Sequence, residues 1–263
     1  MVDNISRPGL IHIAEAVRRT RELAENDQDG IVGIPSGFAS LDRLTNGWQP
    51  GDLIVLAGRP SVGKTAFALS LARNAAVDYG TPVAYFSLEL SAFSLTKRLL
   101  MSDPGTTFED SPLYIDDTPC LSMEEIIGKT KDLTANHYVK LVIIDYIHLL
   151  EDWNSREPDE RILIQLKEAA VKYNVAVIAL SYVLRPIRKN YSGPILSDLD
   201  ACCPRVVDYA DKIILLHRPF IMSAESYNEK YDLLNVRLVK NNTGDVAAPN
   251  LLLDKKSLKI SEP

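Results

Sequence analysis

Short apolar runs alternate with longer stretches of helical periodicity over most of the chain. Runs of aliphatic and β-branched residues predict strands at 53–57, 83–87, 113–115, 140–145, 175–181 and 212–216. Apolar positions at helical spacing predict helices at 64–79, 92–101, 122–136 and 157–173. Apolar strands separated by crossover helices are typical of a parallel sheet that is buried on both faces. The pattern therefore predicts an α/β fold with a mostly parallel central sheet.

The two ends of the chain depart from this alternation. After residue 232, short strands follow one another without helices, which indicates an antiparallel C-terminal extension at one edge of the sheet. These strands are expected at 234–240, 250–254 and 257–260. Residues 8–26 carry a helical pattern with a thin apolar stripe, which must pack on its own domain or on a neighbouring subunit. We therefore expect an N-terminal linker helix and tether at 1–30 and one large domain at 31–263.

The composition is that of an ordinary globular protein, with 46% apolar and 24% charged residues among 263. No run approaches the roughly 20 apolar residues of a membrane span. The N-terminus also lacks the features of a signal peptide, so we expect a cytoplasmic protein with no membrane partner. Cys120, Cys202 and Cys203 lack metal-ligand spacing and are interpreted as reduced thiols rather than as a redox or zinc site. The net charge of −6 argues against a protein that coats DNA with its whole surface, but it allows contact through a local basic loop.

A phosphate-binding loop motif lies between the first predicted strand and the helix that follows it. Residues 58–65 read G-x-x-x-x-G-K-T, and this strand–loop–helix setting is the context that the motif requires. Its backbone N–H groups and the helix N-terminus would face phosphate oxygens, Lys64 would bridge the β- and γ-phosphates, and Thr65 would hold Mg²⁺. The alternative is a glycine turn before a surface lysine. The residues expected to bind ATP here are Gly58, Arg59, Pro60, Ser61, Val62, Gly63, Lys64, Thr65 and Ala66.

Two acidic residues at predicted strand ends complete a catalytic set with Lys64. Asp145 ends the apolar run 141–145, in a strand that we expect to adjoin the nucleotide strand, and would be the second Mg²⁺ ligand; the alternative is a residue that caps the strand. Glu89 follows the strand 83–87 and would orient or deprotonate the attacking water, although glutamate is also common in a first helical turn. These residues predict a nucleoside triphosphatase.

Several segments occur in the same order as in the C-terminal motor domain of the bacterial replicative DNA helicases, the DnaB-like family. The segments are 33–42 (GIPSGFASLD), 47–53 (GWQPGDL), 58–65 (GRPSVGKT), 86–91 (FSLELS), 114–119 (YIDDTP), 142–146 (VIIDY) and 196–199 (LSDL). The chain resembles this family over nearly its whole length. The resemblance implies a RecA-like P-loop NTPase, a homo-oligomer that forms a hexameric ring, ATP between subunits and single-stranded DNA in the central channel. It also implies that residues 8–26 link to the next subunit, whereas the absence of the family's N-terminal domain from this chain leaves primase recruitment without support.

Three positions depart from the family pattern. Tyr182 replaces a glutamine whose amide can sense the γ-phosphate, and Asp200 replaces an arginine. The late Lys-x-Arg pair, which in the family reaches into the neighbour's nucleotide site, is Lys240-Asn241-Asn242 here, so the lysine is kept and the arginine is lost. Because an arginine finger is commonly worth about 10³–10⁵ in rate, these changes put fast hydrolysis in question more than nucleotide binding.

A basic loop follows the strand 175–181, where the resemblance places a DNA-facing loop. Arg185, Arg188 and Lys189 would contact DNA phosphates, and the alternative is a solvated basic loop. The leading hypothesis is an ATP-dependent helicase motor that couples hydrolysis to movement on single-stranded DNA. The alternatives are a hydrolysis-deficient, nucleotide-binding assembly module and a RecA-like recombinase, which the motif set favours less.

Overall fold

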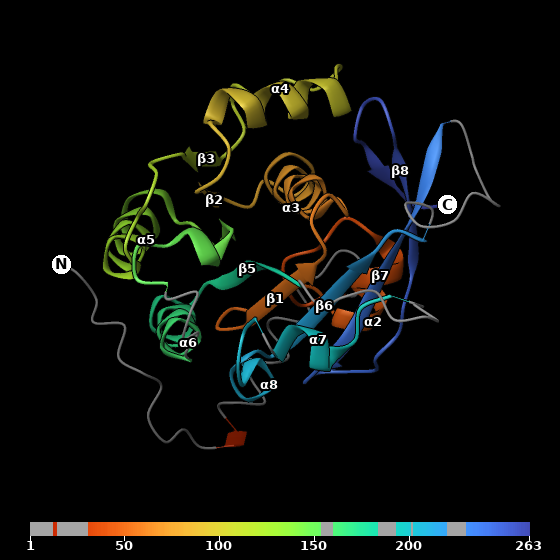
Figure 1. Ribbon diagram of the computed structural model, residues 1–263. Coiled ribbons are helices and arrows are strands. Elements are labelled where there is room, and N and C mark those ends of the chain that lie inside the picture. The colour runs from red at the N-terminus through yellow and green to blue at the C-terminus, as the bar shows by residue number, and fades with distance from the viewer. Residues whose placement is uncertain (1–12, 15–30, 154–159, 184–192, 201, 220–229) are drawn as a thin grey trace.

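The computed structural model describes residues 13–14, 31–153, 160–183, 193–200, 202–219 and 230–263. Its centre is a nine-stranded sheet with the order β3-β2-β4-β5-β1-β6-β7-β8-β9 (Figure 1). The strands are β1 (Leu53–Gly58), β2 (Val83–Ser87), β3 (Leu113–Asp116), β4 (Leu141–Asp145), β5 (Ala176–Tyr182), β6 (Lys212–His217), β7 (Tyr231–Asn241), β8 (Asn250–Asp254) and β9 (Ile260–Ser261). The helices are α2 (Ala39–Thr45), α3 (Lys64–Arg73), α4 (Ala92–Ser102), α5 (Met123–His137), α6 (Arg161–Tyr173), α7 (Leu196–Asp200) and α8 (Val206–Tyr209), with a π-helical turn η1 (Asn74–Asp78) and a 3-10 turn η2 (Ile147–Leu149).

The pairing of the strands confirms the predicted sheet. Strands β1 to β6 pair in parallel, whereas β6 with β7, β7 with β8 and β8 with β9 pair antiparallel at one edge. The described part of the chain holds no helix long and apolar enough to cross a bilayer. The predicted domain boundary near residue 30 stays a prediction, because residues 15–30 lie outside the described ranges.

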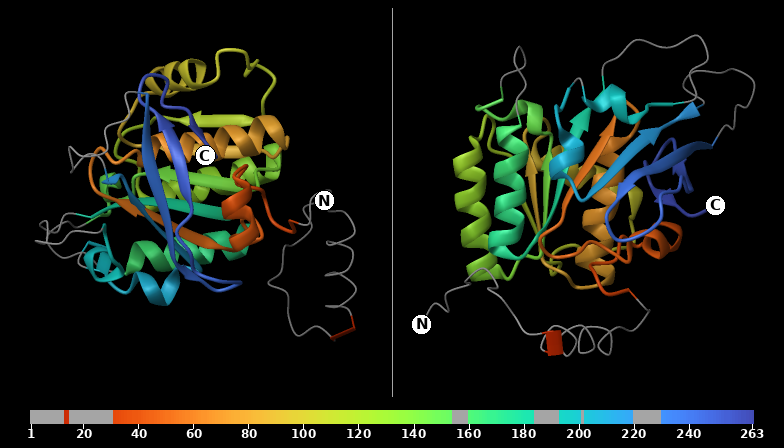
Figure 2. Two further views of the ribbon diagram at one scale, coloured as in Figure 1. Left: turned by 90° about the vertical axis from the view of Figure 1, so that its right-hand side faces the viewer. Right: turned by 90° about the horizontal axis from the view of Figure 1, so that it is seen from below.

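Both faces of the parallel sheet are covered, as its uniformly apolar strands require. Along β1, Ile54 and Leu56 pack in one core with α3 and α4, while Leu53 and Val55 pack in the other with α5 and α6. Side chains alternate between the two faces of a strand, so one apolar run serves both cores. Figure 2 shows α5 and α6 side by side on one face, with the antiparallel strands at the far edge.

Local chemistry sets where the helices begin and end. At the start of α5, the Ser122 side chain accepts from the Glu125 N–H and the Glu125 carboxylate accepts from the Ser122 N–H, a capping box that satisfies two backbone donors. Asn174, with φ of 54°, ends α6 in the left-handed region. The helix predicted at 64–79 ends as α3 at Arg73 and continues as the π-helical turn η1.

Some expectations were wrong. The strand expected at 257–260 is only the two-residue β9, because Lys255–Ser257 form a turn and Leu258 has φ of 61°. The pattern gave no prediction for α2, α7 or α8, which are short. The strand β4 does not adjoin β1, since β5 lies between them. Asp145 nevertheless reaches the region of the phosphate-binding loop, because both strands end at the same edge of the sheet.

Candidate nucleotide site

One cavity of about 530 Å³ lies at the carboxyl edge of the parallel strands. It is bounded by the β1–α3 loop, by the ends of β2, β4 and β5, and by the antiparallel extension. Its lining residues are Pro60, Ser61, Gly63, Lys64, Thr65, Ala66, Glu89, Leu90, Arg98, Asp145, Tyr146, Tyr182, Arg218, Leu253 and Leu258. In open α/β sheets the carboxyl ends of the strands are where ligands bind.

The β1–α3 loop has the backbone geometry of a phosphate cradle. Gly63 has φ of 109° immediately before α3, a conformation that L side chains rarely adopt. A Cβ atom at Gly58 would lie 2.9 Å from Val62 Cγ1 and 3.0 Å from the Leu216 oxygen, so no side chain fits there without movement. Lys64 Nζ donates to the Gly58 oxygen at 3.1 Å, which keeps its ammonium at the mouth of the loop. Burial lowers the pKa of Lys64, opposed by the charges of Asp145 and Glu89.

Asp145 ends β4 and is 2% exposed. The Tyr85 hydroxyl donates to Asp145 Oδ2 at 2.8 Å, and the Thr65 hydroxyl is also hydrogen-bonded to this carboxylate. Burial raises the pKa of Asp145, and these two hydrogen bonds act in the opposite direction by favouring the charged form. Thr65 and Asp145 therefore present two oxygen ligands side by side, the chemistry that Mg²⁺ prefers.

Glu89 enters the same cavity from the end of β2 and is exposed. Lys64, Thr65, Glu89 and Asp145, which were predicted to act together, thus line one cavity, as do Pro60, Ser61, Gly63 and Ala66. The other predicted residues of the loop, Gly58, Arg59 and Val62, do not line it. The Val62 side chain packs in the core, and the Gly58 and Arg59 oxygens accept from Lys64.

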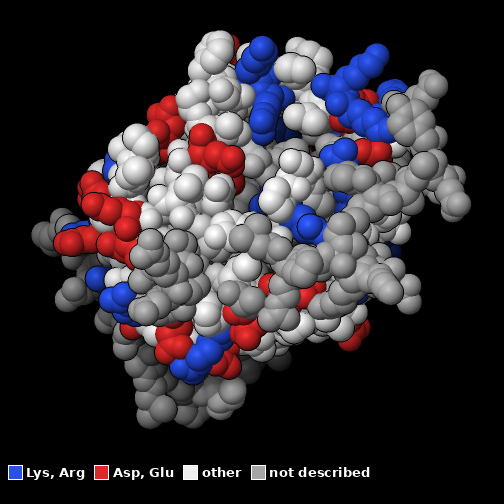
Figure 3. Space-filling view, viewed as in Figure 1, with Lys and Arg blue, Asp and Glu red and all other residues white. Residues whose placement is uncertain are grey.

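Several lining residues were not predicted from the sequence. Arg98 reaches the cavity from α4, and Arg218 reaches it from the residue after β6, where it pairs with Asp232 at 2.6 Å. Leu253 and Leu258 add an apolar wall from the antiparallel extension. No local motif marks these positions. In Figure 3, Lys and Arg side chains gather over α4 and the β8 side of this face, and Asp and Glu gather towards α5, so an anion is attracted to one side of the face.

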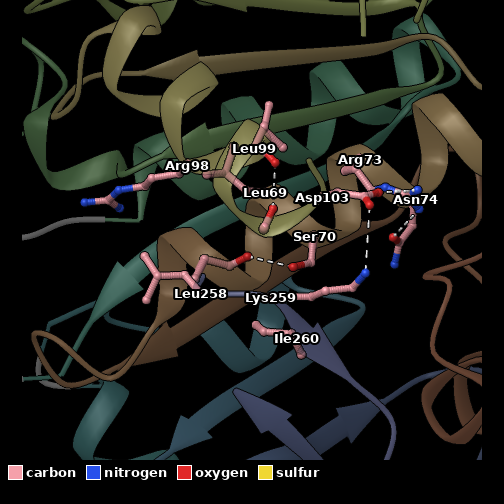
Figure 4. Close-up of a pocket in the computed structure, with 12 residues that line it drawn as sticks. Leu69, Ser70, Arg73, Asn74, Arg98, Leu99, Asp103, Leu258, Lys259 and Ile260 are labelled. Carbon is pink, nitrogen blue, oxygen red and sulfur yellow. Dashed lines mark hydrogen bonds and ion pairs between the residues drawn. The ribbon is translucent and has the colours of Figure 1, made fainter. Parts of the chain in front are cut away.

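A second cavity, of about 140 Å³, lies along the outer side of α3 and shares Ala66, Arg98 and Leu258 with the first. Figure 4 shows its ion pair between Arg73 and Asp103, which the structure places at 2.6 Å, with the Arg98 side chain extending away from that pair. The Asp103 carboxylate there is already paired with Arg73 and lies 3.9 Å from Lys259, and neither Lys64 nor Asp145 lines this cavity. The larger cavity is therefore the candidate nucleotide site.

The sequence matches the family described as "DnaB-like helicase C terminal domain" over residues 33–107 and 102–262. The chain belongs to this family. The match confirms the resemblance on which the sequence interpretation relied.

Known proteins agree with this assignment. The DnaB-like chain is 38% identical over 237 residues to the replicative DNA helicase DnaB of Rhodothermus marinus, a match that covers 74% of this chain and 25% of that protein. It is 34% identical over 269 residues to the replicative DNA helicase DnaC of Bacillus subtilis (strain 168), covering 91% of this chain and 58% of that protein. This chain thus spans between a quarter and three fifths of these relatives' lengths.

Among solved structures, one described as an ATPase domain superposes with a TM-score of 0.85 at 28% identity, covering 97% of this chain and 100% of that one. A structure described as a DnaB-like replicative helicase and its interactions with primase gives a TM-score of 0.82 at 29% identity, covering 96% of this chain and 69% of that one. These likenesses confirm the predicted RecA-like fold class.

The remaining predicted positions of the DnaB-like domain lie elsewhere. Lys240 does not line the cavity of its own chain; its ammonium donates to the backbone oxygens of Val207 and Ala210. The Asn242 amide donates to Asp211 Oδ1 at 3.3 Å, and the Asp200 carboxylate accepts from the Arg205 N–H at 3.1 Å. The three residues predicted to contact DNA, Arg185, Arg188 and Lys189, lie outside the described residues.

Proposed function

We propose that this domain binds Mg²⁺ and ATP and hydrolyses ATP as the motor of a replicative DNA helicase. The observation that carries the proposal is the meeting of Lys64, Thr65, Glu89 and Asp145 around one cavity of about 530 Å³, in a chain of the DnaB-like family. The chain's membership of this helicase family favours a motor over a hydrolysis-deficient assembly module.

The triphosphate would lie across the N-terminus of α3. There the backbone N–H groups of the loop face the phosphates, and Lys64 exchanges its carbonyl contacts for phosphate oxygens. Thr65 and Asp145 would hold the magnesium ion, and the oxygen atoms of these two neighbouring side chains fit a hard divalent cation. When bound, Mg²⁺ neutralises charge on the phosphates.

Glu89 would act on water. In hydrolysis, a water oxygen bonds to the γ-phosphorus, the bond from that phosphorus to the bridging oxygen breaks, and ADP and phosphate leave. The exposed carboxylate of Glu89 would orient that water and accept its proton. Lys64 and the two arginines that line the cavity, Arg98 and Arg218, supply positive charge opposite the transferring phosphoryl group and the polyphosphate.

Leu253 and Leu258 would cover the apolar face of the nucleotide. Leu253 lies beside the loop, since a Cβ atom at Gly63 would be 3.6 Å from Leu253 Cδ2, and Leu258 lines the same cavity. A wall of two leucines offers contact area but no hydrogen-bonding group, so its contribution is to affinity more than to base selection.

Single-stranded DNA and a hexameric ring of identical chains are the proposed partners. This part of the proposal is supported by the family and by relatives named as replicative DNA helicases, of which this chain covers one domain. Arg185, Arg188 and Lys189 are the proposed DNA contacts. One similar solved structure is described by its interactions with primase, so a chain that carries this domain in a longer protein is expected to act beside that enzyme.

Steady-state ATPase measurements with and without single-stranded DNA, with the mass of the assembly determined in parallel, test the proposal. We expect turnover that DNA stimulates, that Lys64→Ala abolishes and that Glu89→Ala reduces sharply while ATP still binds. Lys131→Ala and Glu124→Ala, at exposed positions of α5 away from the cavity, are the matched controls and should leave turnover unchanged. Absent turnover in the unmodified chain, or turnover indifferent to Lys64→Ala, contradicts the proposal.

A further inference from the structure

Tyr182 is the last residue of β5 and forms part of the wall of the nucleotide cavity. It is half-buried and stands beside Tyr146, another wall residue, with their ring centroids 6.0 Å apart and the rings nearly perpendicular at 78°. Tyr146 directly follows Asp145. The aromatic part of the wall is therefore next to the carboxylate that would hold the metal.

Behind this wall, Tyr182 is the first ring of a column. Its ring centroid lies 3.9 Å from that of His148, and the two rings are stacked with an interplanar angle of 29°. His148 in turn meets Trp153, with centroids 4.3 Å apart and an edge-on angle of 62°. The three rings lead from the cavity to Trp153.

The column is held by packing and is nearly free of charge. Burial lowers the pKa of His148 to about 4, an effect that the backbone of Cys202 opposes and the charge of Lys64 reinforces. The imidazole is therefore neutral at physiological pH. Among the described residues, the Trp153 indole nitrogen is buried without a hydrogen-bond partner. A ring fixed by packing moves when its neighbour moves, because close-packed interiors transmit displacement.

The column therefore joins the cavity wall to Trp153, in the segment that follows η2.

We propose that Tyr182 is a positioning residue of the nucleotide site, and that the stacked column Tyr182–His148–Trp153 couples the occupancy of the cavity to Trp153. The inference rests on the proposed function, because it requires a nucleotide in that cavity. A ligand that presses on Tyr182 shifts the stack, and the shift changes the surroundings of the indole.

Trp153 itself reports the coupling. The chain has two tryptophans, and Trp48 is fully buried with an indole nitrogen that has no partner among the described residues. Trp48→Phe therefore leaves Trp153 as the only tryptophan, which can be excited at wavelengths that tyrosine does not absorb. In this variant of the full chain, titration with Mg²⁺ and a non-hydrolysable ATP analogue should change the Trp153 emission with the same dissociation constant that calorimetry gives.

Two substitutions then each remove one ring of the column. His148→Ala and Tyr182→Leu should abolish the emission change while calorimetry still finds the nucleotide bound, and Tyr182→Leu should lower kcat roughly 2- to 10-fold, the range that one aromatic pair is worth. Tyr182→Phe keeps the ring and should keep the emission change. Tyr138→Leu, at an exposed ring before β4, is the matched control and should leave both signals as they are.

Two results would separate the possible failures. Binding in calorimetry with no change in emission, or with a change that survives both His148→Ala and Tyr182→Leu, overturns the column and leaves the nucleotide site standing. No binding in calorimetry overturns the proposed function and this inference together. If Tyr182→Leu lowers the melting temperature, Tyr182→Phe and His148→Ala still decide the question.

Discussion

Tyr85→Phe tests the electrostatics of the carboxylate that would hold magnesium. Tyr85 lies in β2, is 1% exposed and donates through its hydroxyl to Asp145 Oδ2 at 2.8 Å. Phenylalanine keeps the ring and its packing but removes this donor. The change therefore isolates one hydrogen bond to the charged form of Asp145.

The size and sign of the effect follow from that bond. A hydrogen bond to a charged group contributes about 1.5–3 kcal/mol, and about 1.4 kcal/mol corresponds to one pKa unit, so the pKa of Asp145 should rise by roughly 1 to 2 units. Burial already holds this pKa above its ordinary value, and the hydrogen bonds from Tyr85 and Thr65 lower it. Because Mg²⁺ binds the ionised carboxylate, ATP affinity in the presence of Mg²⁺ falls as the pH drops through the pKa of Asp145. This loss of affinity on the acid side, the acid limb of the pH profile, should move to higher pH by the same amount in Tyr85→Phe.

Calorimetric titration with ATP, with and without Mg²⁺, from acidic to neutral pH measures this limb. Tyr114→Phe, on the neighbouring strand β3 and half-buried, removes a hydroxyl that does not contact Asp145 and is the matched control. The reasoning is refuted if the acid limb stays in place in Tyr85→Phe, or if affinity without Mg²⁺ shifts as much as affinity with it.

Stability measurements check other features of the fold. Gly128→Ala, inside α5 where an added Cβ meets nothing within 4 Å, should stabilise the domain by about 0.5–1 kcal/mol and raise the melting temperature by about 2 °C. Gly63→Ala has room for its methyl group beside Leu253 but must adopt φ of 109°, so it should destabilise by about 1–3 kcal/mol; a rise in melting temperature would contradict the strain argument. Lys212 is fully buried and pairs with Asp52, so Lys212→Met leaves that carboxylate without its partner. The free energy of unfolding in urea should fall by about 3–5 kcal/mol, and the double change Asp52→Leu/Lys212→Met should restore most of it.

Local signals account for what the sequence predicted of the fold. The predicted ends of β2, α4 and α5 differ from the observed ends by at most one residue, because each is marked by an apolar run, a capping residue or a turn. Where the signal is weak, the prediction was wrong. Leu258 and Ile260 look like alternating strand positions, yet the Lys255–Ser257 turn leaves only the end of that segment to pair with β8.

The order of the strands in the sheet, unlike the ends of the elements, is not marked by local sequence signals. Nothing within the runs 141–145 and 176–182 says which of them lies next to β1, because each is buried and largely apolar and suits any central position. The order is decided by how crossover helices pack over both faces, and these contacts join residues far apart in sequence. The prediction that β4 adjoins β1 was wrong for this reason, whereas the prediction that Asp145 faces the loop needed only the shared carboxyl edge.

The same distinction explains which site residues the sequence revealed. Lys64 and Thr65 belong to a contiguous motif, and Asp145 and Glu89 stand at strand ends, so each is found without knowing the neighbours of its strand. Arg218, by contrast, follows the strand on one side of β1, and Tyr182, which ends the strand on the other side, was marked only by the family resemblance. Their convergence exists only once β5 and β6 flank β1. Arg98, Arg218, Leu253 and Leu258, which shape the wall of this cavity rather than perform the chemistry, are therefore the residues that only a structure reveals.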